Sequence, residues 1–137
     1  MRRLLLTLIV VCSMLLAVGV ASASPKVSYT FTVADLGQGI WGGGSLFADG
    51  TAGGNVAFSA GNGAVIYHLH ATSWAVLFPG ALDVCFEVRE IKGSSGLPPS
   101  FCISDFGLVL PVTGTPLLID DDGDGNPDFV MRATPTN

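Results

Sequence analysis

The stretch Val27-Ser28-Tyr29-Thr30-Phe31-Thr32-Val33 alternates apolar with polar side chains, so that every second residue is apolar. A period of two residues is typical of a β-strand that buries one face and exposes the other. The same alternation returns in Leu82-Asp83-Val84-Cys85-Phe86-Glu87-Val88-Arg89. These two segments predict strands and indicate that the chain folds as a β protein.

Shorter strand candidates surround these two segments and are separated by turn signals. Asp49-Gly50 and Gly61-Asn62-Gly63 are typical of hairpin turns. All 8 prolines and all but one of the 18 glycines lie after residue 23, and they leave no long window that favours a helix. The remaining strand candidates are residues 45–48, 55–60, 64–72, 100–104, 117–119 and 129–132.

We therefore predict one all-β domain over residues 24–137, built as a single antiparallel β-sandwich or small barrel of about eight strands. Roughly a hundred residues are enough for one such core. The least regular segment is residues 36–44, which contains five glycines and Trp41. We interpret this segment as a loop or a bulged edge strand.

The N-terminus has the three parts of an export signal. Arg2-Arg3 forms a basic region, residues 4–20 are almost entirely apolar, and Ala21-Ser22-Ala23 supplies the small residues of a cleavage site. An uncleaved membrane anchor is the alternative, because the apolar run is nearly long enough to span a bilayer. We predict that residues 1–23 are a signal peptide of the general secretory route. The domain would then be secreted or periplasmic, without a stable membrane anchor.

The acidic residues are concentrated in one place. Residues 24–137 contain four basic and eleven acidic residues, a formal charge of −7, and five of the acids lie between Asp120 and Asp128. A chain with so few basic residues is not a nucleic-acid binder. A local acidic cluster on an otherwise nearly neutral chain indicates a cation site.

The register of the acidic segment is fixed by its glycines. Residues 120–128, Asp-Asp-Asp-Gly-Asp-Gly-Asn-Pro-Asp, fit the pattern D-x-D-x-D-G-x-x-D only when the turn glycine is Gly125. We therefore predict a Ca²⁺ site, because oxygen ligands suit a hard cation. The ligands of this site are Asp120, Asp122, Asp124, Asn126 through its backbone carbonyl, and Asp128. The alternative is an acidic, solvated turn without an ion.

This loop resembles the calcium loops of EF-hands, dockerins, thrombospondin type 3 repeats and FG-GAP/VCBS-type β repeats. The resemblance covers about a dozen residues and implies an ion site. Position twelve is Met131 instead of the bidentate glutamate of an EF-hand, and Thr113-Gly114-Thr115-Pro116 precludes an incoming helix. The resemblance therefore implies neither a helix-loop-helix switch nor a propeller, which would need several such loops.

Two cysteines remain after the predicted cleavage, and their positions fit a hairpin. Opposite residues of an antiparallel pair have a constant sum, so pairing Cys85 with Cys102 centres the turn between Gly93 and Ser94, inside a glycine-serine segment. Directly opposed positions bring two cysteines within bridging range. We predict a structural disulfide. Two free thiols or two metal ligands are the alternative.

Two further groups of residues could carry chemistry. His68-Leu69-His70 places two imidazoles on one face of a strand, a spacing that can bind a transition metal, and no third ligand follows nearby. A solvent-facing pair is the alternative. Trp41 and Trp74 could stack on a sugar or fill the core.

The leading functional hypothesis is a secreted, non-enzymatic, calcium-stabilised β domain that acts as a structural or binding module, with a glycan or surface protein as the class of partner. The competing hypothesis is a carbohydrate-binding module or a small metal-dependent enzyme that uses His68 and His70. A sugar-binding module requires an exposed tryptophan on a flat or concave face. An enzyme requires the two histidines to converge with a third ligand in a pocket.

Overall fold

The computed structural model describes residues 23–36, 39–60, 65–92, 97–120 and 123–137. The predicted signal peptide lies outside these ranges except for Ala23. No helix in the described ranges is long and apolar enough to cross a membrane. The elements are β1 (Val27–Asp35), β2 (Ile40–Phe47), β3 (Ala52–Ala60), β4 (Val65–Phe78), β5 (Ala81–Lys92), β6 (Ser100–Cys102), the 3-10 turn η1 (Ile103–Phe106), β7 (Leu110–Pro111), β8 (Leu117–Ile119) and β9 (Phe129–Pro135).

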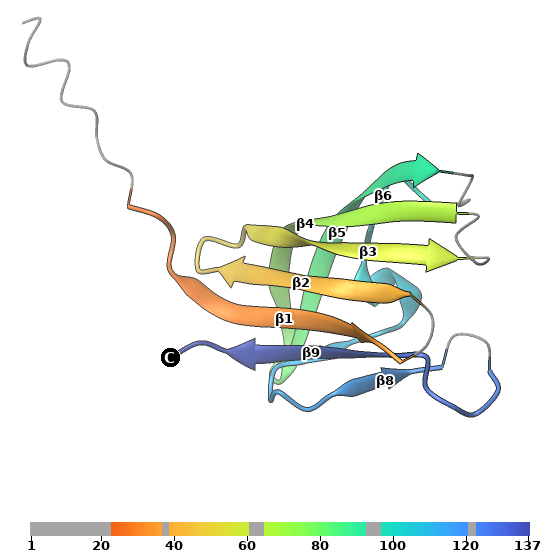
Figure 1. The fold of residues 1–137 in the computed structure, drawn as a ribbon. Helices are drawn as coiled ribbons and strands as arrows, with labels where there is room; N and C mark the ends of the chain where they lie inside the picture. The colour runs from red at the N-terminus through yellow and green to blue at the C-terminus, as the bar shows by residue number, and fades with distance from the viewer. Residues whose placement is uncertain (1–22, 37–38, 61–64, 93–96, 121–122) are drawn as a thin grey trace, which may run out of the picture.

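The described strands form one antiparallel sheet, which curls into a half-barrel (Figure 1). Their order is β6-β5-β4-β3-β2-β1-β9-β8, and β7 pairs with the beginning of β5. Neighbours in sequence are neighbours in the sheet from β1 to β6, because short hairpins connect them. The all-β prediction is confirmed, and the architecture is an incomplete barrel made of one sheet.

The β4–β5 hairpin gives the sheet its curl. Its register shifts at three places, and each irregularity bends the strand pair and increases its twist. Beyond Ser73, which still bridges to Thr51, the hairpin turns behind β2, β1 and β9 (Figure 1). There the Trp74 indole N–H donates to the carbonyl of Phe47 at 2.7 Å, and the Trp74 ring contacts Tyr29 edge-on. These contacts tie the bent half of the hairpin to the front strands.

The core lies on the concave side of this curl. Phe31 and Phe86, from strands that are not neighbours, meet edge to face with ring centroids 5.9 Å apart. Alternation along β1 and β5 delivers these rings inward, as the sequence predicts. The other buried apolar side chains include Val33, Ile40, Leu46, Val56, Ala71, Leu82, Val84, Ile103, Leu110, Met131 and Ala133.

The prediction for the glycine-rich segment is wrong for residues 40–44. These residues belong to β2, an interior strand between β1 and β3, whereas a loop or edge strand was expected. The reason is steric. A Cβ on Gly44 would lie 2.0 Å from the Gly53 carbonyl oxygen, and a Cβ on Gly43 would lie 2.5 Å from that of Phe31. The glycines therefore allow the neighbouring backbones to approach β2 closely.

The other differences concern where strands end. β4 runs six residues beyond the predicted end at Thr72, and β9 runs to Pro135. The expected strand over residues 100–104 ends at Cys102 and continues as η1. The Asp105 carboxylate causes this change of direction, because it accepts the backbone N–H of Cys102 at 2.8 Å and caps the turn.

Candidate functional site

The acidic segment forms the loop between β8 and β9, as expected from its sequence. The pair Ile119 and Phe129 closes the hairpin directly below it. The backbone N–H of Asp128 donates to Ile119 O at 2.7 Å, and the Asp128 carbonyl accepts from Leu36 N at 2.8 Å. The base of the loop is therefore attached to β8 and to the end of β1.

The loop backbone curls around the carboxylate of Asp120. This carboxylate accepts the backbone N–H of Gly123 at 2.7 Å and that of Gly125 at 2.9 Å. Both glycines have positive φ, 75° and 90°, a region that side chains with a Cβ rarely adopt. Farther along, Asp124 Oδ1 accepts the backbone N–H of Asn126. The carboxylates that were predicted to bind calcium thus also organise the backbone of the loop.

The predicted ligands differ in their surroundings. Asp120, Asp124 and Asn126 are exposed, whereas Asp128 is only 8% exposed at the base of the loop. Asp122 lies outside the described residues. Asp120, Asp124 and Asp128 do not gather their carboxylate oxygens within 4.8 Å of one another. The donor set is all oxygen, which fits calcium chemistry. Gathering the ligands around an ion would require the exposed side chains to turn.

A second candidate site lies on the outer face of the sheet. The register places Trp41, Ala57, His68 and Arg89 in one row across β2, β3, β4 and β5. Their sequence neighbours Ile40 and Val56 are buried on the concave side, so the row belongs to the convex side. Trp41 is 56% exposed there. The small Ala57 beside it leaves the indole accessible.

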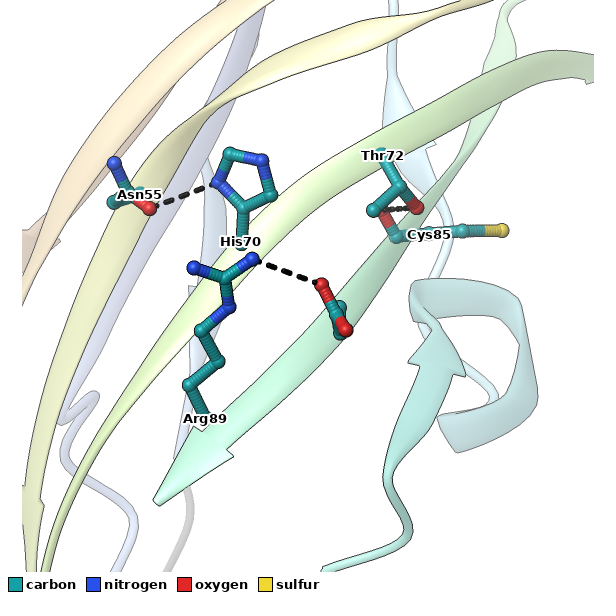
Figure 2. A network of polar contacts seen from close by, with 6 residues as sticks. Asn55, His70, Thr72, Cys85 and Arg89 are labelled. Carbon is teal, nitrogen blue, oxygen red and sulfur yellow. Dashed lines mark hydrogen bonds and ion pairs between the residues drawn. The ribbon is translucent and has the colours of Figure 1, made fainter. Parts of the chain in front are cut away.

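A parallel row of polar residues adjoins the first. Gly43, Asn55, His70 and Glu87 are paired across the same four strands. His70 Nδ1 and Asn55 Oδ1 lie 3.0 Å apart, a hydrogen bond between neighbouring strands (Figure 2). On β5 the guanidinium of Arg89 donates to Glu87 at 3.2 Å. This ion pair is exposed and contributes little to stability, so both groups are available to a ligand.

The structure does not bring a third ligating side chain to the two histidines among the described residues. His68 and His70 lie on the open convex face, and neither belongs to a set of three ligating side chains. The one such set in the described residues is Asp83, Cys85 and Cys102. Its two cysteines form a disulfide, so it does not offer thiolates to a metal.

The disulfide prediction is confirmed. Cys85 and Cys102 lie directly opposite each other and are bonded. The neighbouring pairs, Phe86 with Phe101 and Glu87 with Ser100, follow the predicted register. The alternative of free thiols or metal ligands is wrong. The turn at Gly93 and Ser94 lies outside the described residues.

The sequence pointed to the histidines and to both tryptophans, but not to their grouping. Trp74 is half-buried, because its indole bonds to Phe47 and packs on Tyr29. Asn55 was missed entirely, since a single asparagine in a strand gives no signal of its partner. Correct pairing of β3 with β4 would have brought Asn55 opposite His70.

Comparison with known proteins gave no relative. No family model matches the chain, and no curated protein and no solved structure is significantly similar to it.

Proposed function

We propose that the chain is an exported, non-catalytic β domain that is stabilised by its disulfide and by one Ca²⁺ ion in the loop at residues 120–128. The observation that carries the proposal is the arrangement of Asp120, Gly123 and Gly125, in which two left-handed glycines wrap the backbone around the first carboxylate. Five carboxylates in nine residues repel one another without a cation. A bound ion would remove that repulsion.

The role of the ion is structural. The loop connects β8 to β9, and β9 pairs with β1 over seven residues, from Asp35 with Phe129 to Tyr29 with Pro135. Neutralising the loop therefore favours docking of the last strand. Calcium is abundant outside cells, so a Kd of about 10⁻⁴ M keeps such a site filled. At tenfold over Kd the ion stabilises the fold by roughly 1.4 kcal/mol.

Thermal unfolding tests this role. The wild type should melt at a lower temperature after chelation, and Asp124→Ala should remove that response while the fold persists. Asp105→Ala is the matched control, because Asp105 is an exposed aspartate outside the loop that caps η1. The control should lose some stability yet keep the response to calcium. Identical melting of the wild type with and without chelator would refute the role.

A second candidate function, carbohydrate binding, is favoured by the exposure of Trp41. Sugars present flat apolar faces and many hydroxyls, and Trp41 offers a stacking surface next to polar side chains. His68 and Arg89 in the same row, and Asn55 in the adjoining row, can donate or accept hydrogen bonds. Trp41 is exposed as the sequence criterion requires, but it lies on the convex side of the sheet instead of a flat or concave face. This candidate is therefore a shallow surface site without a pocket.

Glycan-array binding, followed by calorimetry on any positive glycan, tests this candidate. Trp41→Ala should abolish binding, because it removes the stacking surface. Leu118→Ala is the control, since Leu118 is a similarly exposed apolar side chain on β8, away from the Trp41 row. Equal binding by the wild type and Trp41→Ala, or no positive glycan on a broad array, would exclude this function.

A further inference from the structure

The concave side of the half-barrel contains a cavity of about 500 Å³. Its floor comes from successive strands, with Val33, Ile40, Val56 and Leu69 from β1 to β4. The segments after β5 and the β8–β9 hairpin supply the other walls. The cavity lies opposite the convex face that carries Trp41, and so it is a separate site.

Its size and lining distinguish this cavity from a packing defect. Interiors are close-packed, and voids larger than a water molecule are few. Sites for small molecules have volumes of roughly 300–1,000 Å³ and mainly apolar walls. Here every described lining residue is apolar except Asp120. The rings of Phe58, Phe101 and Phe129 line the cavity and are only partly buried, so an apolar occupant would remove them further from water.

Asp120 is the one charged residue among the described lining residues, and it is exposed, which places it at the rim of the cavity. Its carboxylate is held by the backbone N–H groups of Gly123 and Gly125, one on each oxygen. A carboxylate oxygen has a second acceptor position, so each can still meet a donor from a ligand. A cation or hydrogen-bond donor is favoured beside it, and an anion is repelled.

We propose that this cavity binds a small apolar molecule with one positively charged end, and that Asp120 receives that end. The body of the ligand contacts the aromatic and aliphatic walls. The cation lies at Asp120, and fatty-acid anions of the same length are disfavoured. Asp120 is also a ligand of the proposed calcium site, so a bound Ca²⁺ ion would compete with the positively charged end for the same carboxylate. The inference is therefore tested in the presence of a chelator, so that failure of one proposal leaves the other standing.

Displacement of a neutral fluorescent probe, N-phenyl-1-naphthylamine, measures occupancy with the mature chain. Decylamine, decanol and decanoate are the competitors at neutral pH, below their aggregation concentrations. Decylamine should bind about tenfold more tightly than decanoate, a ratio that corresponds to ~1.4 kcal/mol. Asp120→Asn should remove that preference and leave decanol unchanged. Equal affinities of decylamine and decanoate for the wild type would overturn the charge assignment.

Two variants test the location. Leu69→Trp and Leu108→Trp each add volume to a half-buried lining residue and should abolish binding of the probe. Leu118→Trp is the matched control, because Leu118 is exposed and outside the lining. If Leu69→Trp and Leu108→Trp fail to fold, methyl NMR of the wild type tests the location instead. Decylamine should shift the methyl signals of Val56 and Leu69 and leave those of Leu118 unchanged. No probe binding by the wild type, or unmoved Val56 and Leu69 signals, would overturn the proposal.

Discussion

Gly44 and Gly54 lie opposite each other in β2 and β3, and the two backbones approach too closely for a side chain on either one. A Cβ on Gly44 would lie 2.0 Å from the Gly53 carbonyl and 2.8 Å from the ring of Phe31. A Cβ on Gly54 would lie 2.3 Å from the Gly43 carbonyl. The centre of the sheet therefore depends on the absence of side chains, and the ring of Phe31 covers the gap.

Gly44→Ala should destabilise the domain by at least ~2 kcal/mol, because backbone atoms must move to admit the methyl group. Gly53→Ala is the control in the facing strand, where a Cβ meets only the edge of Phe47 at 3.5 Å, an ordinary contact. Urea denaturation of both variants measures the difference. Equal midpoints for Gly44→Ala and Gly53→Ala would contradict this account of the glycine-rich strand.

Local sequence patterns predicted the strands whose residues alternate between apolar and polar. They did not predict the strand segments that are determined by contacts with distant parts of the chain. Alternation at residues 27–33 and 82–89 placed β1 and β5, and the positions of two cysteines gave the β5–β6 register. Residues 40–44 of β2 gave no such signal, because their glycines are required by the close approach of the β1 and β3 backbones. The bend of β4 depends on its contact with Phe47 and Tyr29, which lie far away in sequence.

The same limit applies to the candidate sites. The loop at residues 120–128 is local, so its position between two strands could be predicted from spacing alone. The row that joins Trp41 to Arg89 combines residues from four strands. The cavity combines residues from most strands of the sheet. Such sites require the pairing of strands, which a single sequence does not specify.

Reduction of the disulfide should lower stability. Cys85 and Cys102 are separated by 17 residues, and closing a loop of that size stabilises the fold by about 3 kcal/mol through the unfolded chain. The double variant Cys85→Ala, Cys102→Ala should show the same loss without reductant. Denaturation with and without reductant measures it. A midpoint that reductant does not change would count against a structural role for the bond.

Asp49 in the β2–β3 turn should titrate below its usual range. The hydroxyl of Thr51 and, with a smaller effect, its backbone N–H donate to the carboxylate of Asp49. These hydrogen bonds lower the pKa of Asp49 below its ordinary value of 3.8. Because the folded pKa is the lower one, this contribution to stability is present above the unfolded pKa and is lost as the pH falls through the folded pKa. Thr51→Val should raise the pKa of Asp49, and Thr51→Ser should keep it low. NMR titration of the carboxyl carbon measures this, and an unchanged midpoint in Thr51→Val would contradict the assignment.

The left-handed glycines of the acidic loop offer a backbone test that leaves every carboxylate in place. Gly125 has φ of 90° and no atom within 4 Å of an added Cβ, so Gly125→Ala is strained by its dihedral angle alone. Such strain costs of order 1–3 kcal/mol where the loop must hold that conformation. Calcium affinity should fall by about tenfold for each 1.4 kcal/mol. Gly80→Ala, in a turn with φ of 93° and equally open space, is the control and should leave calcium affinity unchanged.

One Ca²⁺ ion should bind the loop at residues 120–128. Calorimetric titration of calcium into the chelator-treated mature protein measures this directly. We predict saturable binding of one ion with a Kd at or below about 10⁻⁴ M, and loss of that binding in Asp124→Ala. An absence of binding heat in the wild type at several temperatures, or equal binding by Asp124→Ala, would contradict the claim.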